Sequence, residues 1–286
     1  MKTFLTIFTP TYNRAYILPK LYESLKTQTN KNFVWHIVDD GSSDETKMLV
    51  QNFQNEDQIE IQYFFQENMG KHFAVNQGLK KTETEFFCVI DSDDYLAENA
   101  VEEMESLSHK IKKNDQIAGF TFIRFSEKIN YDKAKYGKNE WISSRRINYE
   151  WEFPGEMIFC IKTNVHQQFY FPEFEGEKFC PESLILRRIE RQFKILVTDK
   201  VLAFGDYLED GLMNNYYQLL LKSPKSSLLN IKERFQDEIS PEEKSNLVKT
   251  YWDIASKTKQ PFFTKFFGIN PFLILNFLIN KKLKHQ

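Results

Sequence analysis

The segment FFCVIDSDDY, Phe86–Tyr95, places five apolar residues directly before three aspartates, Asp91, Asp93 and Asp94. Its apolar half predicts a buried β-strand, because a short run of aromatic and β-branched residues bounded by polar clusters is typical of a strand inside a sheet. Carboxylates this close raise each other's pKa unless a cation or several hydrogen-bond donors offset their charge. The segment therefore predicts a ligand site at the carboxyl end of a buried strand.

The sequence on both sides of this segment alternates between strand and helix patterns. Apolar runs predict strands over 4–8, 33–38, 59–65 and 86–90. Apolar residues at helical spacing predict helices over about 14–28, 42–53, 70–79 and 96–111. Ser42 and Glu45 form a capping-box pattern at the start of the second helix. This alternation predicts an α/β fold, Rossmann-like, with a mostly parallel central sheet and helices on both faces.

Polar clusters follow all four predicted strands at the point where each strand ends. They are TPTYNR at 9–14, DDGSSD at 39–44, ENMGKH at 67–72 and DSDD at 91–94. Asp, Ser and Gly are also ordinary turn and cap residues, and for Asp40 and Asp44 a turn or cap role is favoured. Ligands of parallel sheets bind beyond the carboxyl ends of the strands, so the four loops are expected to converge on one crevice.

The rest of the chain predicts a second region. Further strands are expected over 117–125 and 157–161 and a helix over 181–193. From Gly211 onward the pattern predicts three helical segments separated by Pro224, Pro241 and Pro261. We therefore expect a first domain over 1–210, which contains the predicted crevice, and a helical C-terminal region over 211–286.

The composition excludes several classes of protein. With 286 residues and 41% hydrophobic residues the chain is globular, and a formal net charge of -2 disfavours nucleic-acid binding. Three cysteines, Cys88, Cys160 and Cys180, show no CxxC spacing, which disfavours a disulfide framework and a zinc site and favours a cytoplasmic location. No apolar stretch approaches the roughly 18 residues of a spanning helix, so a soluble or peripheral protein is expected.

Asp91 and Asp93 are the candidate metal ligands. Mg²⁺ and Mn²⁺ prefer oxygen ligands and commonly combine one or two carboxylates with substrate phosphates. A phosphatase of the DxDxT kind is the competing interpretation of the motif, but Tyr95 stands where that motif has threonine.

Four segments together resemble a family 2 glycosyltransferase of the GT-A fold, of the bacterial surface-polysaccharide type. They are FTPTYNRAYILPKLYESLKTQT at 8–29, FVWHIVDDGSSDET at 33–46, ENMGKHFAVNQGL at 67–79 and VIDSDDYL at 89–96. Their order and spacing resemble the family over about 1–110. The resemblance implies a UDP-sugar donor, a divalent metal and inversion of the anomeric configuration.

The resemblance also implies roles for individual residues around the nucleotide. Thr9, Pro10 and Tyr12 match the first-strand loop that lines the nucleotide, with Tyr12 against the base. Asp39 matches the residue that accepts a hydrogen bond from uracil N3. Lys71 stands where the family often has a basic residue near the base or the phosphates.

The aspartate motif supplies the metal side of the implied site. Asp91 matches the position that faces the ribose or the metal, and Asp93 the position that binds the metal directly. Asp94 extends the motif and is a candidate cap for the following helix.

The segment FPEFEGEKFCPESLILRR, 171–188, supplies the candidate catalytic base. It resembles the acidic acceptor-side motif of the family, although PE stands where many members have ED. Inverting transfer needs a base for the acceptor hydroxyl, and Glu182 is the first candidate and Glu177 the second. If Glu182 is the base, we expect it to be partly buried. Alternatively, Glu182 lies in the first helical turn after Pro181 and only stabilises the helix through its interaction with the helix dipole.

The C-terminal segment PFFTKFFGINPFLILNFLINKKLKHQ, 261–286, combines phenylalanines with a lysine-rich end. Such a pattern predicts either a peripheral contact with a membrane interface or a helix packed on protein, on the catalytic domain or in a homodimer.

The predicted function is transfer of a sugar from a UDP-sugar to a glycan or lipid-linked acceptor in cell-surface polysaccharide biosynthesis. A nucleotidyltransferase would share the nucleotide crevice and the metal but release diphosphate. A non-catalytic nucleotide-sugar-binding protein is the third hypothesis.

Overall fold

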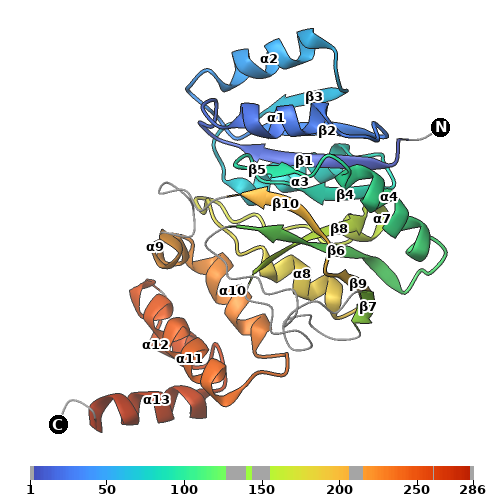
Figure 1. Cartoon of the computed structure of the whole chain (residues 1–286). Coiled ribbons are helices and arrows are strands. Elements are labelled where there is room, and N and C mark those ends of the chain that lie inside the picture. Colours follow the sequence, from blue (N-terminus) through green and yellow to red (C-terminus); the bar gives the residue numbers. More distant parts are fainter. Residues whose placement is uncertain (1–2, 127–139, 144–154, 206–214, 260, 284–286) are drawn as a thin grey trace. The chain divides into compact units, whose positions relative to one another are not determined.

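The computed structural model describes the chain except for residues 1–2, 127–139, 144–154, 206–214, 260 and 284–286 (Figure 1). The residues form two compact units, one of Met1–Phe171 and Ile185–Gly211 and one of Pro172–Leu184 and Leu212–Gln286. The predicted domain boundary at Asp210 falls outside the described residues. The sequence did not indicate that 172–184 belongs to the second unit.

The first unit is built on one sheet with the strand order β3-β2-β1-β4-β8-β6-β10-β5 (Figure 1). Its first four strands are parallel: β1 Leu5–Thr11, β2 Phe33–Asp39, β3 Ile61–Phe65 and β4 Phe86–Val89. The register aligns Leu5 with both Phe33 and Phe86. The carboxyl ends of these four strands therefore lie along one edge, as the alternating pattern predicted.

The other strands mix both directions. They are β5 Asp94–Leu96, β6 Ile117–Phe125, β7 Glu140–Ser143, β8 Glu156–Lys162, β9 Lys194–Thr198 and β10 Val201–Gly205. Strand β8 is antiparallel to β4 and to β6, whereas β6 is parallel to β9 and β10. The sequence analysis missed β5, whose last residue, Leu96, was expected to begin a helix. The helix there, α4, spans Ala100–Ile111.

Helices cover both faces of the parallel strands. Helices α1 Leu18–Lys26, α2 Thr46–Glu56 and α4 share one apolar core with Ile7, Trp35 and Phe86. Helix α3 Lys71–Lys81 packs on the other face, where a Cβ on Gly78 would lie 2.1 Å from the ring of Phe8. Side chains of neighbouring strand residues point to opposite faces, so Ile7 and Phe8 serve the two layers.

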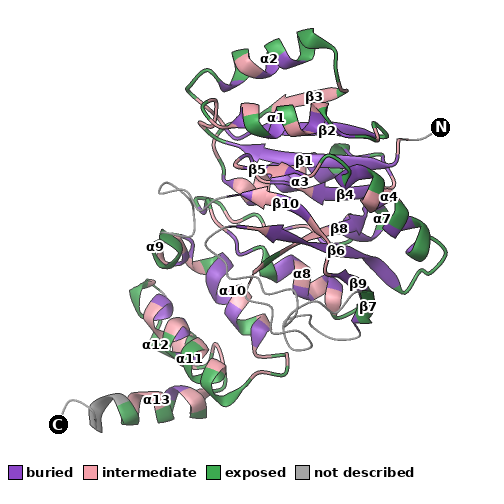
Figure 2. Cartoon of the chain, in the orientation of Figure 1, coloured by how far each residue is buried: buried purple, intermediate pink, exposed green. Residues whose placement is uncertain are grey.

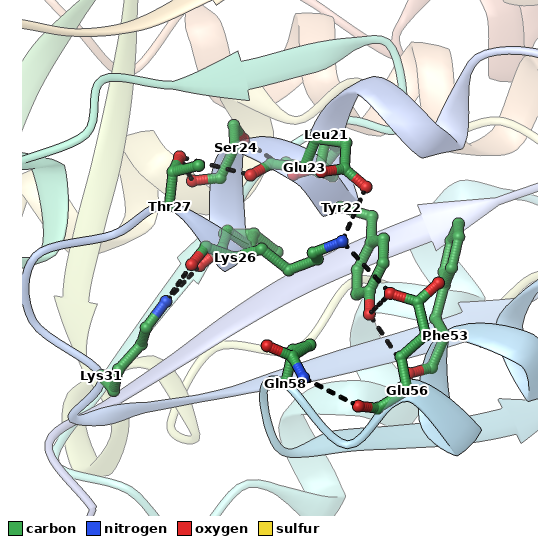
Figure 3. A network of polar contacts seen from close by, with 11 residues as sticks. Leu21, Tyr22, Glu23, Ser24, Lys26, Thr27, Lys31, Phe53, Glu56 and Gln58 are labelled. Atoms are coloured by element: carbon green, nitrogen blue, oxygen red, sulfur yellow. Dashed lines mark hydrogen bonds and ion pairs between the residues drawn. The ribbon is translucent and has the colours of Figure 1, made fainter.

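A polar network fastens α1 to α2 beside this core (Figure 3). Lys26 Nζ donates to Glu23 Oε1 at 3.0 Å and to Glu56 Oε2 at 3.1 Å. The hydroxyl of Tyr22 also donates to Glu56 Oε2, at 2.9 Å. Burial and the neighbouring Glu56 raise the pKa of Tyr22 to about 12, so this hydroxyl remains a donor.

The predicted capping box at the start of α2 is wrong. Helix α2 begins at Thr46, and its backbone N–H is accepted by Asp44 Oδ1 at 3.0 Å. The hydroxyl of Ser42 instead accepts the N–H of Asn13, 2.8 Å away in the loop after β1. Ser42 thus makes a tertiary contact between two loops and does not cap the helix, as the local pattern had predicted.

Two short helices complete the segment between β8 and β9, α7 Thr163–His166 and α8 Ser183–Glu190. The second unit contains α9 Tyr216–Lys222, α10 Pro224–Arg234, α11 Pro241–Lys257, α12 Phe262–Phe266 and α13 Pro271–Leu283. Three helical segments were predicted and five are found among the described residues. Pro224 and Pro241 are the first residues of α10 and α11, and Pro261 directly precedes α12; at these positions a missing N–H costs nothing. None of the described helices is long and apolar enough to cross a bilayer.

His166 makes the stability of the first unit sensitive to acid. Its ring is buried edge-on to Phe87 at 5.5 Å, and burial lowers its pKa from 6.5 to about 4. The neutral ring is the folded form, so its contribution is intact above pH 6.5 and is lost as the pH falls through 4. Between pH 7 and pH 4 the unmodified chain should lose roughly 3 kcal/mol of unfolding free energy through His166. We expect His166→Phe to lack this part of the loss.

Urea unfolding at a series of pH values measures this difference. His109→Phe is the control, since His109 lies exposed on α4. Equal acid dependence of His166→Phe and the unmodified chain would contradict the assignment.

Candidate functional site

The loops after β1 and β2 are joined by hydrogen bonds. The side chain of Asn13 accepts the N–H of Ser43 at 2.8 Å, and Asp44 Oδ2 accepts the N–H of Ala15 at 3.0 Å. Asn13 has a φ of 52°, a left-handed conformation that asparagine tolerates better than most residues. Asp44 therefore has the turn and cap role predicted for it.

Asp40 joins the loop after β2 to the loop after β3. Its buried carboxylate accepts the N–H groups of Met69 and Gly70, both at 2.8 Å, and the amide of Gln66 at 2.6 Å. The loops approach so closely that a Cβ on Gly41 would lie 2.7 Å from the backbone nitrogen of Asn68. The structural role predicted for Asp40 is confirmed, and it positions the segment that leads into Lys71.

Asp39 lies at the end of β2 and is completely buried. Its carboxylate accepts the N–H of Ser42 and the hydroxyl of Tyr63, each at 2.7 Å. Burial first, and Asp39 second, raise the pKa of Tyr63 above its ordinary value. The uracil contact of Asp39 stays a prediction: the carboxylate retains acceptor capacity but has no exposed surface in this structure.

The nucleotide contacts predicted for Thr9, Pro10 and Tyr12 stay predictions, and the structure shows where these residues lie. Strand β1 continues to Thr11, so Thr9 and Pro10 lie inside the sheet and are buried. The hydroxyl of Thr9 accepts the indole N–H of Trp35 at 2.9 Å, which assigns its side chain to the core. Tyr12, the first residue after the strand, is 48% exposed, so its ring is available to a planar ligand.

Lys71 and Asp91 meet at the same edge of the sheet. The ammonium of Lys71, the first residue of α3, lies 2.6 Å from Asp91 Oδ1 and 2.9 Å from Asp91 Oδ2. Asp91 and Asp93 are both half-buried. Burial first, and the charge of Asp91 second, raise the pKa of Asp93. A divalent cation between these two carboxylates would relieve that repulsion, so the residues present fit a metal.

The described residues contain no ready-made cage for such a cation. Within the described parts of the chain, no group of three or more His, Cys, Asp or Glu side chains is arranged to hold a metal. A site here would take its remaining oxygens from the ligand, as is common for Mg²⁺.

Asp94 has a different role from the helix cap expected of it. It belongs to β5, and its Oδ1 accepts a hydrogen bond from Nε of Arg124 on β6 at 2.6 Å, with both side chains buried. Burial, followed by the neighbouring Asp91, raises the pKa of Asp94 to about 7. A Cβ on Gly205 would lie 1.9 Å from Asp94 Oδ1, so the glycine leaves room for the pair. The sequence analysis missed Arg124, although an arginine inside the apolar run 117–125 was its signal.

The two candidate bases belong to the second unit. Glu177 is buried, and its carboxylate accepts the N–H groups of Lys225 and Ser226 at 2.7 and 2.8 Å. Those groups open α10, so Glu177 caps a helix, and this role accounts for its burial without a catalytic function. Glu182 is exposed beside the start of α8, and the partial burial expected of a base is absent from this structure. Glu182 remains the leading candidate.

Comparison with known proteins places the site in a family context. The model of "Glycosyl transferase family 2" matches residues 6–169, more than half of the chain. Over 99 residues the chain is 37% identical to a GalNAc(5)-diNAcBac-PP-undecaprenol beta-1,3-glucosyltransferase of Campylobacter jejuni, covering 34% of this chain and 32% of the relative. The matched stretches span about a fifth to a third of the length of the first curated relatives.

Solved structures share the fold. Residues 1–349 of TarS from S. aureus in complex with UDP align with a TM-score of 0.62 at 18% identity, covering 90% of this chain and 81% of that one. The mannosyltransferase PcManGT of Pyrobaculum calidifontis, with GDP-Man and Mn²⁺, aligns with a TM-score of 0.58 at 13% identity, covering 99% and 76%. The architecture is thus the GT-A fold with additional C-terminal helices.

Asp40 tests the coupling between the loops. Replacement by alanine leaves the buried N–H of Gly70 and the buried amide of Gln66 without their acceptor, so Asp40→Ala should lower the unfolding free energy by about 2–4 kcal/mol. Urea unfolding measures the loss, with the exposed Asp115→Ala as the control. A loss below about 1 kcal/mol would show that the loops do not depend on this carboxylate.

The Asp94–Arg124 pair tests the buried charges. Arg124→Met leaves a buried carboxylate unpaired and should cost about 3–5 kcal/mol, whereas Asp94→Asn combined with Arg124→Met should regain much of that loss. Lys200→Met is the control, because the Lys200–Glu103 pair is partly exposed and should cost less than about 1 kcal/mol. Additive losses in the double variant would contradict a direct coupling.

Proposed function

Because the chain belongs to glycosyl transferase family 2, we propose that it transfers a sugar from a UDP-sugar to an acceptor hydroxyl with inversion of configuration. The observation that carries the proposal is the convergence of Lys71, Asp91 and Asp93 at the carboxyl edge of the parallel strands. This is where nucleotides bind in such sheets, and it combines one cation with two carboxylates.

The donor is proposed to lie across the loops after β1 and β4. The exposed ring of Tyr12 offers a stacking surface for a base, and Asp39 and Asp40 shape the neighbouring loops. The complexes of TarS with UDP and of PcManGT with GDP-Man and Mn²⁺ support a nucleotide-sugar donor. Uridine is favoured because the chain resembles family members in which an aspartate at the position of Asp39 binds uracil N3.

Asp93 and Asp91 would hold Mn²⁺ or Mg²⁺. When bound, such a cation supplies positive charge against the donor's diphosphate. Lys71 adds its own charge at the same edge, where Asp91 orients the ammonium group. A fixed positive charge at the leaving group stabilises the negative charge that develops there during transfer.

Glu182 is proposed as the base that takes the proton of the acceptor hydroxyl. The hydroxyl then attacks the sugar from the face opposite the diphosphate, which inverts the configuration. The acceptor is proposed to be a glycan or lipid-linked glycan in cell-surface polysaccharide assembly. The protein is proposed to act in the cytoplasm, at the inner face of the cell membrane. A relative whose name includes a PP-undecaprenol glycan supports this acceptor class.

Release of UDP tests the donor and the metal together. With a panel of UDP-sugars, GDP-mannose and Mn²⁺, the unmodified chain should release UDP from one sugar and lose the activity on chelation. Asp93→Asn should reduce the rate about a hundredfold or more, because the chain would no longer hold the cation whose positive charge lies opposite the diphosphate. Asp57→Asn, in the exposed turn after α2, is the matched control.

Other products would contradict the proposal. Diphosphate in place of UDP would identify a nucleotidyltransferase. Metal-dependent UDP binding without turnover on any acceptor glycan would identify a nucleotide-sugar-binding protein.

Glu182→Gln tests the base. With a glycan acceptor, kcat should fall by about a hundredfold or more while UDP binding is unchanged, and the acid limb of the kcat profile should disappear. Glu175→Gln is the matched control, an exposed glutamate of the same segment. A Glu182→Gln profile equal to that of the control would exclude the role.

A further inference from the structure

Helices α12 and α13 expose an apolar surface that the second unit does not cover. Phe263 on α12 is 72% exposed and Phe272 on α13 is 77% exposed. Figure 2 shows exposed residues on the part of α13 whose burial is described. We call this set the C-terminal apolar surface; its residues are Phe262, Phe263, Phe267, Phe272, Leu275 and Ile279.

Helix α13 is apolar on two sides. Ile274 is buried and Leu278 partly buried in the core that α13 shares with α11, whereas Leu275 and Ile279 are exposed. A helix that is apolar all round is normally buried on all sides. One side of α13 therefore stabilises the second unit, and the other side is suited to an apolar environment outside it.

The α12 part of the surface is held in place by α11. The hydroxyl of Tyr251 donates to the carbonyl of Lys265 at 3.0 Å, and Lys265 Nζ donates to the carbonyl of Thr258 at 2.7 Å. The phenylalanines stack on each other, Phe262 on Phe266 at 5.6 Å and Phe263 on Phe267 at 6.4 Å. The rings are thus presented on an ordered helix.

The charge of this segment differs in sign from that of the rest of the chain. Residues 254–286 contain no aspartate or glutamate and six lysines, Lys257, Lys259, Lys265, Lys281, Lys282 and Lys284. Removing these six from the 38 basic residues leaves 32 against 40 acidic ones, a formal charge of -8 for 1–253. Positive charge is therefore concentrated in the same part of the sequence as the exposed phenylalanines.

We propose that the C-terminal apolar surface binds the headgroup and acyl boundary of an anionic lipid bilayer, to which the net positive charge of 254–286 adds an electrostatic attraction. Exposed aromatic rings next to lysines, without acidic residues, are the chemistry that such an interface accepts. Helix α13 has 13 residues and a length of about 20 Å, so it lies along the interface. The inference goes beyond the proposed function and does not depend on it.

Charge complementarity favours lipid over a second copy of the chain. In a symmetric dimer through this surface, the same patch of each copy faces the other, so lysines of one copy would lie near lysines of its partner. The described part of the segment offers no acidic partner for them. An anionic bilayer instead offers apolar depth and opposite charge together.

Vesicle sedimentation with the full chain tests the proposal. Vesicles of phosphatidylcholine with 30% phosphatidylglycerol are compared with vesicles of phosphatidylcholine alone, without donor or metal. The unmodified chain should bind the anionic vesicles, and Phe263→Ser combined with Phe272→Ser should reduce partitioning at least about tenfold. Met48→Ser combined with Ile142→Ser, two exposed apolar residues of the first unit, should leave it unchanged.

The electrostatic part has its own variant. The triple variant Lys281→Gln, Lys282→Gln and Lys284→Gln should reduce partitioning to the anionic vesicles about tenfold or more. A higher salt concentration should also reduce the partitioning of the unmodified chain. Equal binding to both vesicle types would overturn the proposal, as would absence of vesicle binding. A dimer that dissociates in the phenylalanine variant but not in its control would assign the surface to a second copy.

Failure here and failure of the proposed function are distinguishable. Vesicle binding is measured without turnover, and UDP release is measured without vesicles. The phenylalanine variant should release UDP at the unmodified rate from a water-soluble acceptor.

Discussion

The concentration of aspartates at the carboxyl edge of the sheet is the constraint on which the first unit depends. Six carboxylates lie at the end of β2 or in the segments that follow β2 and β4. They are Asp39, Asp40, Asp44, Asp91, Asp93 and Asp94. The structure offsets them in three ways: backbone N–H groups for Asp40 and Asp44, a hydroxyl and an N–H for Asp39, and cations for Asp91 and Asp94. Burial still raises the pKa of both Asp93 and Asp94, and for Asp93 the charge of Asp91 adds to the shift, a repulsion that a cation held by Asp91 and Asp93 would relieve.

The same interactions shape the loops. Because Asp40 binds Met69 and Gly70, the loop after β3 is drawn toward the loop after β2, and Lys71 follows directly as the first residue of α3. Lys71 then meets Asp91 at the end of β4. The contacts that stabilise the charges of Asp40 and Asp91 therefore also position Lys71. The nucleotide site proposed for this edge depends on these contacts.

The second unit uses charge differently. Glu177, one of the two candidate bases, caps α10. This role explains why its carboxylate is buried and accepts hydrogen bonds from the N–H groups at the start of that helix. At the other end of the unit, the sequence 254–286 combines six lysines and no acidic residue with exposed phenylalanines. A buried acid at a helix start stabilises the fold, whereas a segment with excess positive charge and exposed apolar side chains suits a partner of opposite charge.

The sequence by itself determined the alternation of strands and helices, the four loops at one edge and the family, since periodic apolar runs and short motifs are local properties. It also indicated structural roles for Asp40 and Asp44. Only the tertiary structure decided that Ser42 serves a loop and not a helix, that Thr9 serves the core, and that Arg124 neutralises Asp94. Each of these partners is about thirty residues away in sequence, so no local pattern contains the contact; the parallel register and the packing of the sheet create it.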